Sequence, residues 1–364
     1  MARAFAAAGH RVVYWTGDFS HASKRRREMK FSCREHGIDL RMAPVVPYAG
    51  NVGLRRLYSH WRLAGTWRRL AKAESVRPDA LVASTPPLSL CHAAMRFARR
   101  CGALAVADAM DAWPETFERV APRWTLFPLR RLARRIYTGA DAVSAVAARY
   151  LDLVKSYGAA CPTRLAYHGI DISGGMVCPE RRSRPVGDAI RAVYAGAFGA
   201  SYDLETAIET VKRMPDATLD LAGSGPKEVA LKRLAQGCPR IRFHGYLDDV
   251  ALKALLARCD VGLVPMFPES CVGVPYKLAD YAAAGLRIVE CLGGETQALV
   301  ARFRVGTHYA PGDAASLAAA LRALPDPDGD ASGLARLFDA SRIMPEYVAW
   351  VESLVAEKKG LIPQ

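Results

Sequence analysis

Residues 191–226 have the sequence "RAVYAGAFGASYDLETAIETVKRMPDATLDLAGSGP". An apolar strand with a glycine turn is predicted over 191–199, an amphipathic helix over 203–214, and a second strand with a second glycine turn over 218–226. A strand–helix–strand unit with short connections favours a parallel sheet that is covered by helices. This segment therefore predicts an α/β domain.

The same alternation continues along the rest of the chain. The 364 residues are too many for one ordinary core, and residues 169–188 are rich in Gly, Pro and Arg, as an interdomain linker should be. We therefore expect two Rossmann-like, doubly wound parallel-sheet domains that face each other across a cleft, with ligands at the carboxyl ends of strands. The other predicted strands are at 11–15, 80–84, 103–108, 141–146, 163–169, 240–247 and 286–295.

The first residues, "MARAFAAAGH", predict a helix rather than a strand. Because a Rossmann-like domain normally begins with a strand and a glycine-rich turn, the N-terminal domain is expected to lack its first strand. Either the reading frame begins further upstream or the sheet is reduced. His10 and Arg11 interrupt the apolar stretch too early for a signal peptide, and no apolar run is long enough for a membrane helix.

The nine cysteines form no CxxC pair and no metal-ligand spacing. Without an export signal, we expect reduced thiols in the cytosol that mostly fill small buried spaces. No metal and no other cofactor is predicted. The cysteines are at positions 33, 91, 101, 161, 178, 238, 259, 271 and 291.

The formal net charge of +14 favours an anionic partner, and the basic clusters at 23–30, 54–72 and 129–137 all lie in the first half of the chain. Tryptophans among the arginines of the helix predicted over 54–75 suit an anionic membrane surface. A solvated helix that packs by one face is the alternative. Nucleic acid is disfavoured because no binding motif accompanies the charge. The membrane-surface residues would be Arg55, Arg56, Trp61, Trp67, Arg68 and Arg69.

A candidate anion site lies in "FPESCVGVPYKLADYAAAG" (267–285). Pro275 leads into a helix whose first N–H groups and dipole attract negative charge. Lys277 adds a full charge, and Asp280 lies one turn further on the same face. A diphosphate beside a sugar with hydroxyl groups would use all three features, whereas a Lys–Asp surface pair is the alternative. The glycine turns at Gly196, Gly223 and Gly225 would form walls of the same cleft.

A candidate catalytic segment is "VADAMDAWPETF" (106–117). It follows a predicted strand, so Asp108 and Asp111 would lie at the carboxyl end of that strand and could take a proton from a hydroxyl nucleophile. A structural role as a helix cap is the alternative for Asp111. His168 ends another strand and could reach the cleft, although a single such histidine is more often structural.

A set of short motifs, quoted in chain order at the end of this paragraph, resembles bacterial family 4 glycosyltransferases. The resemblance is greatest to those that build exopolysaccharide and O-antigen repeat units. The resemblance covers nearly the whole chain and implies the GT-B fold, a nucleotide-sugar donor, a metal-independent reaction and usually retention at the anomeric carbon. It implies an acceptor-side domain at 1–172, a donor-binding domain at 173–342 and a C-terminal helix at 343–364 that crosses back to the first domain. The motifs are "HASKRRRE", "PYAGN", "ASTPPLSL", "DAMDAWPETF", "AYHGID", "YAGAFGASYDLETAIE", "LAGSGP", "FHGYLDD", "VPYKLADYAAAGLRIV" and "LGGE".

The resemblance also assigns roles to residues. Asp280 matches a carboxylate that binds the donor ribose, and Lys277 becomes the preferred diphosphate contact. Val272, next to Gly273, stands where the family has a first glutamate, so Glu269 or Glu295 would take over its role. Asp111 matches an acidic position in a "D-x-W-P-E" pattern, and His168 replaces the asparagine of "P-N-G-[IV]-D".

These patterns together predict a peripheral glycosyltransferase on the inner face of the cytoplasmic membrane. It would move a sugar from a nucleoside diphosphate to a hydroxyl of a polyprenyl-diphosphate-linked or glycan acceptor. Hydride transfer is disfavoured because no G-x-G-x-x-G with a downstream acidic residue appears. A sugar-nucleotide epimerase on the same fold and a non-catalytic, transferase-like scaffold subunit are the alternatives.

Overall fold

The computed structural model divides the chain into two compact units, Met1–Ala166 with Ser341–Gln364 and Tyr167–Ala340. The divisions fall shortly before the predicted boundaries at 172/173 and 342/343. Cys33, Cys178, most of the predicted linker and part of the first basic cluster lie outside the residues that the structure describes. The described ranges are 1–21, 24–27, 37–50, 53–118, 120–172, 189–324 and 329–360.

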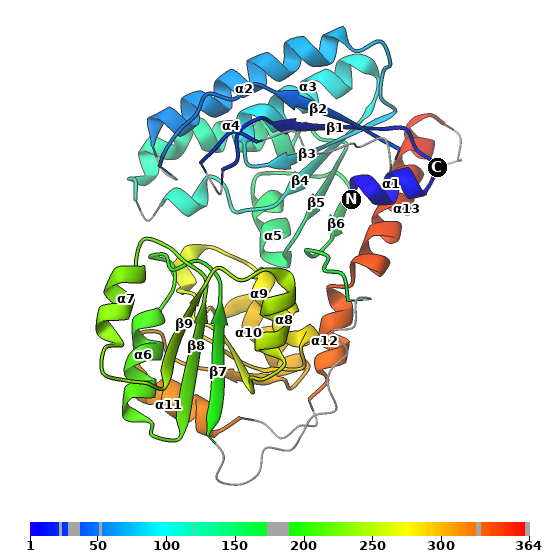
Figure 1. Ribbon diagram of the computed structural model, residues 1–364. Coiled ribbons are helices and arrows are strands. Elements are labelled where there is room, and N and C mark those ends of the chain that lie inside the picture. Colours follow the sequence, from blue (N-terminus) through cyan, green and yellow to red (C-terminus); the bar gives the residue numbers. More distant parts are fainter. Residues whose placement is uncertain are drawn as a thin grey trace. The chain divides into compact units, whose positions relative to one another are not determined.

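The second unit, Tyr167–Ala340, contains a six-stranded parallel sheet (Figure 1). Its strand order, β12-β11-β10-β7-β8-β9, shows that the chain starts in the middle and winds to both edges. This is the doubly wound arrangement that the sequence predicts. The strands are β7 (Ile190–Ala195), β8 (Ala217–Ala222), β9 (Ile241–Gly245), β10 (Val261–Val264), β11 (Arg287–Glu290) and β12 (Gly306–His308).

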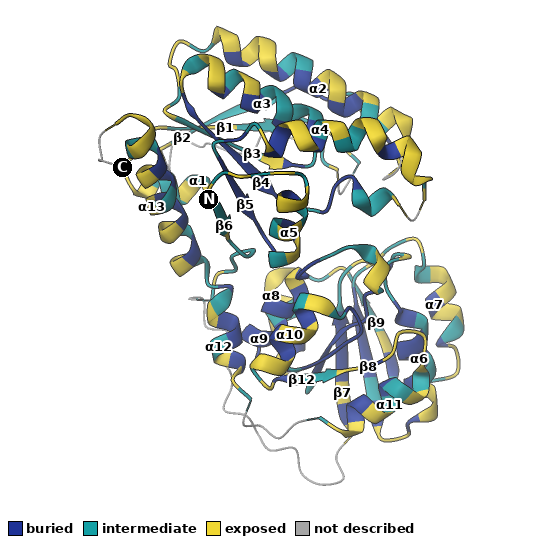
Figure 2. Ribbon diagram, turned by 180° about the vertical axis from the view of Figure 1, so that it is seen from behind, coloured by how far each residue is buried: buried dark blue, intermediate teal, exposed yellow. Residues whose placement is uncertain are grey.

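Helices cover both faces of this sheet. Apolar side chains of α6 (Leu204–Arg213), α7 (Glu228–Leu234) and α11 (Ala314–Arg322) form one core with the strands. The other face carries α8 (Asp249–Leu256), α9 (Tyr276–Ala283) and α10 (Gly294–Arg302), and α12 (Ala331–Leu337) packs against α9 (Figure 1). Figure 2 shows the central strands mostly buried between these layers, as expected for a parallel sheet, whereas the edge strands β9 and β12 are mostly only partly buried.

The first unit contains two parallel sheets in the part of the chain that the structure describes. One pairs β1 (Val12–Gly17) with β2 (Ile38–Ala43), a strand that the sequence does not predict. The other has the order β3-β4-β5-β6. Its strands are β3 (Ala80–Thr85), β4 (Leu104–Ala109), β5 (Ala142–Ala145) and β6 (Thr163–Leu165).

The helices of the first unit come from both ends of the chain. Tyr347, Val351 and Leu354 of the C-terminal helix α13 form a core with Leu104 and Val106 of β4. This helix is therefore an integral part of the first unit. The helices are α1 (Ala2–Ala7), α2 (Leu54–Ala73), α3 (Leu88–Cys101), α4 (Phe127–Tyr137), α5 (Ala148–Ser156) and α13 (Ala340–Lys358).

Two further predictions concern cysteines and membrane spans. The seven described cysteines are free thiols, of which Cys91 and Cys291 are buried and the others partly buried. No helix among the described residues combines the length and the apolar character needed to cross a bilayer.

Candidate functional site

Lys277, in the second unit, is a buried lysine, and lysines are seldom buried in folded proteins. It lies in the first turn of α9 after Pro275, and only 8% of it is exposed. Its Nζ lies 4.7 Å from the ring centroid of Tyr194 and 4.3 Å from that of Tyr202. Burial lowers the pKa of Lys277 to about 7, and the nearby Asp280 opposes this shift. Because no described carboxylate lies within ion-pair distance, the two aromatic faces and the more distant Asp280 together offset part of the cost of burying its charge.

Asp280 lies one turn beyond Lys277 on the same helix. It is partly buried, and burial raises the pKa of its carboxyl. Asp249 raises this pKa further, whereas Lys277 lowers it. The sequence prediction that these two side chains share one face of α9 is consistent with this electrostatic coupling.

Of the predicted glycines, Gly196 lies beside Lys277, and Gly223 packs against Gly196. A Cβ on Gly196 would lie 3.3 Å from Lys277 Nζ and 3.0 Å from the Tyr194 hydroxyl. A Cβ on Gly223 would lie 1.9 Å from the Gly196 carbonyl oxygen, and one on Gly225 would lie 2.6 Å from the Phe198 carbonyl oxygen. The turns after β7 and β8 can therefore pack closely only because these positions carry no side chain. The result is a closely packed pair of glycine turns, of which Gly196 lies next to the buried cation.

We expect Gly223→Ala to destabilise the protein by more than about 2 kcal/mol, because the new methyl group would collide with backbone and the φ of +135° disfavours alanine. Gly237→Ala is the matched control. Its φ of +80° is also in the left-handed region, but a Cβ there meets open space. Chemical denaturation of both variants measures the difference. Equal losses of stability would mean that the close approach of the two turns has no energetic role.

The other predicted donor residues have different environments. Val272 is partly buried, and Gly273 is buried, with its carbonyl accepting a 3.0 Å hydrogen bond from Thr296 Oγ1. Glu269 is exposed in a short 3₁₀ turn. Glu295, in the first turn of α10, accepts a 2.7 Å hydrogen bond from the Tyr167 hydroxyl.

His168 lies next to the start of α9. Its ring stacks on that of Tyr276, with centroids 3.8 Å apart. Burial lowers the pKa of His168 to about 4, so the imidazole is neutral near pH 7. A neutral ring can orient a polar group by a hydrogen bond, but it cannot act as a charged acid there.

The sequence reasoning missed Glu290 and the two tyrosines around Lys277. Glu290 is completely buried at the end of β11, where it accepts a 2.8 Å hydrogen bond from the Gly293 N–H and lies 2.6 Å from His308 Nδ1. It thereby holds the glycine turn that leads into α10. Its position at the carboxyl end of a strand was the available signal.

The structure corrects the prediction that Asp108 is catalytic. This residue is only 3% exposed, and its two carboxylate oxygens accept hydrogen bonds of 3.0 Å from Ser84 and 2.7 Å from Ser144. Burial raises the pKa of its carboxyl. Asp108 therefore ties β4 to its two neighbouring strands and is enclosed away from any substrate.

Asp111 has a different environment in the turn after β4. It accepts a 2.8 Å hydrogen bond from the Ala112 N–H. Burial raises the pKa of its carboxyl, against the effects of the Ala112 N–H, Arg56 and Trp113. The Arg56 guanidinium lies 4.8 Å from the Trp113 ring centroid. The charge of Arg56, which was predicted to lie on a membrane surface, therefore acts on Asp111.

Two histidines that the sequence reasoning did not select complete this group. The His60 ring lies 5.6 Å from that of Trp113, and His21 Nδ1 lies 2.9 Å from the Tyr48 hydroxyl. Burial, followed by repulsion from Arg56, lowers the pKa of both histidines to about 4. We call Asp111, Arg56, His60, His21 and Tyr48 the Asp111 cluster.

The remaining membrane-surface candidates lie on α2. Trp61 is 64% exposed, and Arg68 and Arg69 are also exposed. Arg55 is exposed and donates a hydrogen bond to the Pro47 carbonyl. Trp67 is a further correction, because it is only 5% exposed and packs edge-on against Phe97 of α3. Trp67 is a core residue and cannot contact a membrane in this fold.

Comparison with known proteins gives several curated relatives. A glycogen synthase of Mycobacterium tuberculosis is 31% identical over 43% of the chain, and the sulfoquinovosyl transferase SQD2 of Arabidopsis thaliana is 22% identical over 72% of it. The chain spans 39% and 52% of the lengths of these two relatives.

Solved structures share the fold at low sequence identity. Sucrose-phosphate synthase from Thermosynechococcus elongatus has a TM-score of 0.70 at 17% identity, with 99% of this chain and 90% of that chain covered. Anabaena HepE, solved in complex with UDP and glucose, has a TM-score of 0.67 at 16% identity, with 97% and 94% covered.

Two family models match successive parts of the chain. The model described as "Glycosyltransferase Family 4" matches residues 1–173, and the one described as "Glycosyl transferases group 1" matches residues 190–326. These two matches follow the two Rossmann-like units and leave little of the chain uncovered. Both parts of the chain are therefore similar to glycosyltransferases, and the fold is the GT-B fold of the solved structures above.

Proposed function

We propose that this protein transfers a sugar from a nucleoside-diphosphate donor to a hydroxyl of a lipid-linked or glycan acceptor in surface polysaccharide synthesis. The reaction would proceed with retention at the anomeric carbon and without a metal. The observation that carries the proposal is the buried Lys277, which lies at the start of a helix and beside the glycine turn at Gly196. A buried cation of this kind is expected where an anionic group binds.

The donor would bind to the second unit. Its diphosphate would lie against Lys277 and the N–H groups at the start of α9, where the helix dipole adds positive potential. Asp280 would accept hydrogen bonds from ribose hydroxyls. When the glycosidic bond breaks, negative charge grows on the leaving diphosphate, so a fixed cation lowers the barrier without a metal. The UDP bound to Anabaena HepE supports a nucleoside diphosphate as the ligand.

The acceptor would be activated or oriented by the first unit. Asp111 is the carboxylate of this unit that follows a strand and has its pKa raised by burial. Arg56 beside it favours the charged form, so the carboxylate can accept a hydrogen bond from a sugar hydroxyl near neutral pH. The neutral histidines of the Asp111 cluster offer further hydrogen bonds for a glycan.

A peripheral position on the inner face of the cytoplasmic membrane is part of the proposal. Near its start, α2 exposes Leu54, Tyr58 and Trp61, and exposed arginines follow them. Aromatic and basic residues on one helix suit the interface of an anionic bilayer. A lipid-linked acceptor would then be available at that surface.

The experiment that tests the function supplies purified protein with a panel of nucleoside-diphosphate sugars and with polyprenyl-diphosphate-linked sugars in phosphatidylglycerol vesicles. We expect release of a nucleoside diphosphate in a one-to-one ratio with a glycosylated acceptor, and co-sedimentation of the protein with the vesicles at low salt. An epimerised sugar nucleotide without acceptor product would favour an epimerase. Donor binding without turnover on any acceptor would favour a scaffold subunit, and either result would contradict the proposal.

A further inference from the structure

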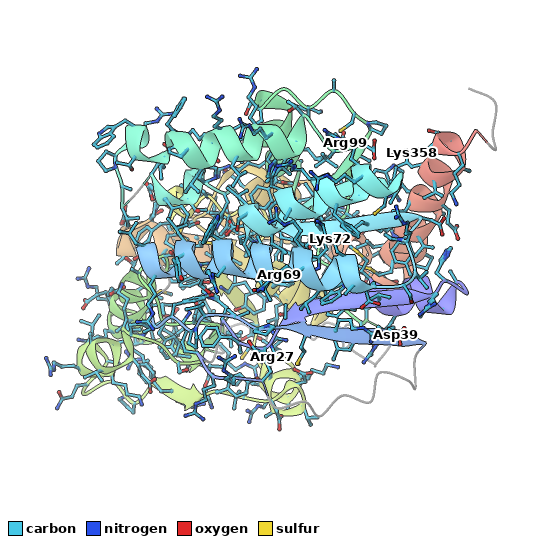
Figure 3. All side chains as sticks on the ribbon, turned by 90° about the horizontal axis from the view of Figure 1, so that it is seen from above. Arg27, Asp39, Arg69, Lys72, Arg99 and Lys358 are labelled. Carbon is cyan, nitrogen blue, oxygen red and sulfur yellow. The ribbon has the colours of Figure 1, made fainter. Side chains whose placement is uncertain are left out.

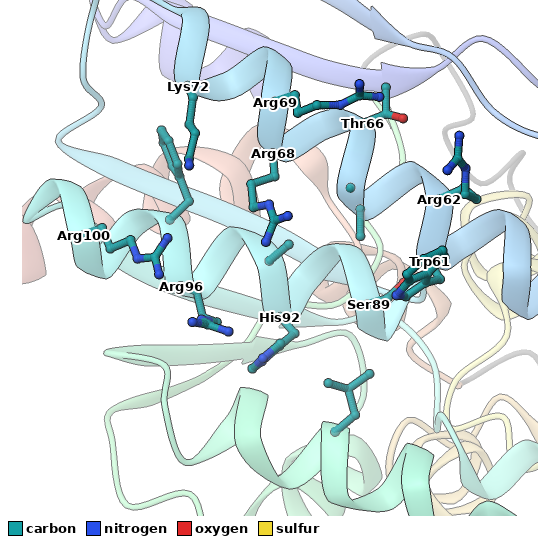
Figure 4. A pocket seen from close by; sticks show the side chains of 15 residues that line it. Trp61, Arg62, Thr66, Arg68, Arg69, Lys72, Ser89, His92, Arg96 and Arg100 are labelled. Carbon is teal, nitrogen blue, oxygen red and sulfur yellow. The ribbon is translucent and has the colours of Figure 1, made fainter.

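A cavity of about 510 Å³ lies on the outer, helical side of the first unit, lined by α2, α3 and Leu132 of α4. Its lining includes six Arg or Lys side chains and, among the described residues, no Asp or Glu. Figure 4 shows Arg68 and Lys72 extending from α2 toward α3, with Arg96 and Arg100 on α3 beneath them. Figure 3 shows the same helical layer with Lys72 on α2 and Arg99 on α3. The cavity is separate from the Asp111 cluster.

The arrangement of these charges is unfavourable in the protein alone. Arg68 and Lys72 are four residues apart on α2, and Arg96 and Arg100 are four residues apart on α3, so each helix has a like-charge pair on one face. Lys72 and Arg100 belong to the last turns of their helices, where the dipole favours cations. Arg68 and Arg96 lie before the last turns, so the helix dipole does not account for their positions. A bound anion would compensate all four.

Two buried polar atoms of the cavity lining have no hydrogen-bond partner among the described residues, Ser89 Oγ and His92 Nδ1. Burial lowers the pKa of His92, and repulsion from Arg96, Arg135 and Arg99 lowers it further. Buried polar atoms without partners are uncommon in folded proteins and need an explanation. A ligand oxygen that accepts a hydrogen bond from the Ser89 hydroxyl supplies one.

The apolar part of the lining limits what kind of ligand fits. Phe97, Ala93 and Leu132 lie beside the basic residues, and the exposed Trp61 borders the cavity. The volume is in the range of small-molecule sites and exceeds what a single phosphate needs. The ligand would therefore combine an anionic group with an apolar one.

We propose that this cavity binds a phosphate group, as a phosphomonoester or a diphosphate, carried by a molecule with an apolar portion. An arginine guanidinium can bind two phosphate oxygens at once, and Arg96, Arg100, Arg68 and Lys72 all line this one cavity. The same chemistry is available from the headgroup of an anionic lipid and from a soluble phosphorylated metabolite. This site is additional to the donor and acceptor sites, and the inference does not depend on the proposed transferase activity.

The test measures inorganic pyrophosphate binding by calorimetry and binding to phosphatidylcholine vesicles that carry phosphatidic acid. Both use full-length protein with Lys277→Met, so that the proposed donor site does not contribute. The double variant Arg96→Gln/Arg100→Gln is expected to weaken binding on the order of tenfold or more. The matched control, Arg131→Gln/Arg134→Gln, removes the same charge from exposed positions of α4 that do not line the cavity. We expect it to change binding less than about twofold.

Ser89→Ala provides a test at constant net charge, and we expect it to weaken binding severalfold with an unchanged thermal midpoint. Pyrophosphate binding that depends on the cavity residues supports the site and assigns it to soluble ligands, whereas vesicle binding alone assigns it to lipid headgroups. The inference is overturned if neither probe binds, or if the α4 control loses as much affinity as the cavity variant. An equal loss in the α4 control would mean that binding follows the net charge of the protein rather than the residues of the cavity.

Discussion

Lys277→Met is expected to lower sugar transfer on the order of a hundredfold to a thousandfold, because it removes the cation that would stabilise the leaving diphosphate. Donor affinity should fall as well, which a calorimetric titration with nucleoside diphosphate measures. Methionine keeps most of the side-chain volume against Tyr194 and Tyr202, so the fold is retained. Removal of a buried charge should even raise the thermal midpoint near about pH 6, where Lys277 is protonated.

Lys253→Met is the matched control for this variant. Lys253 is exposed on α8 of the same unit, so its replacement removes an equal charge without touching the glycine turns. We expect transfer and donor affinity to stay within about twofold of the parent protein. Donor affinity that is the same in Lys277→Met as in the parent would remove Lys277 from the donor site.

The pH dependence of donor binding provides a second readout for Lys277. In the free protein its pKa is about 7, and a bound diphosphate would raise it by favouring the charged amine. Above pH 7, the Lys277 amine therefore takes up a proton when the donor binds. Affinity should be greatest below the free pKa and should fall by up to about tenfold per pH unit as the pH rises through it, until the pKa of the complex is passed. Lys277→Met should lack this dependence.

Asp111→Asn is expected to reduce turnover on the order of a hundredfold to ten-thousandfold while leaving donor affinity unchanged, because the amide cannot take a proton from the acceptor hydroxyl. The parent enzyme should lose activity as the pH falls through the pKa of Asp111, which burial raises from its ordinary value. The residual activity of the variant should lack this acid-side loss. Steady-state kinetics across pH with a lipid-linked acceptor measure both effects.

Asp152→Asn is the control for that experiment, since Asp152 is an exposed carboxylate on α5 of the same unit. It should behave like the parent protein. If Asp111→Asn retains full turnover and an unchanged pH profile, Asp111 is a structural turn residue, and the acceptor must be oriented by other groups.

The sequence alone predicted β7, β8, β9 and β11 of the second unit, because each of them runs into a glycine turn, whereas the three-residue strand β12 was not predicted. β2 was missed although Ile38–Ala43 alternates apolar residues with Asp39 and Arg41, which is the pattern of a half-buried strand. The sequence also did not reveal that Trp61 is exposed whereas Trp67 is buried. Apolar residues occur on more than one face of α2, so its pattern does not fix which face packs on α3.

The candidate sites were predictable only in part. Lys277, Asp280 and the three glycines belong to local motifs, and local motifs can be recognised in a single sequence. The Asp111 cluster combines His21, Tyr48 and His60 with Asp111 from a segment far along the chain, and no local spacing indicates this contact. Asp108 and Asp111 are only three residues apart, and the neighbouring residues in the sequence do not distinguish them. Only the serine hydroxyls on the neighbouring strands decide that Asp108 is structural.

The packing of α13 into the first unit has a consequence for how the molecule is made. Tyr347 and Val351 complete a core whose strands are synthesised roughly 200 residues earlier. During translation, the second unit has its whole sequence available before the first unit does. Part of the sheet in the first unit therefore stays uncovered until α13 has been synthesised. Expression of residues 1–166 alone would leave that apolar face open, and we expect aggregation rather than an independent domain.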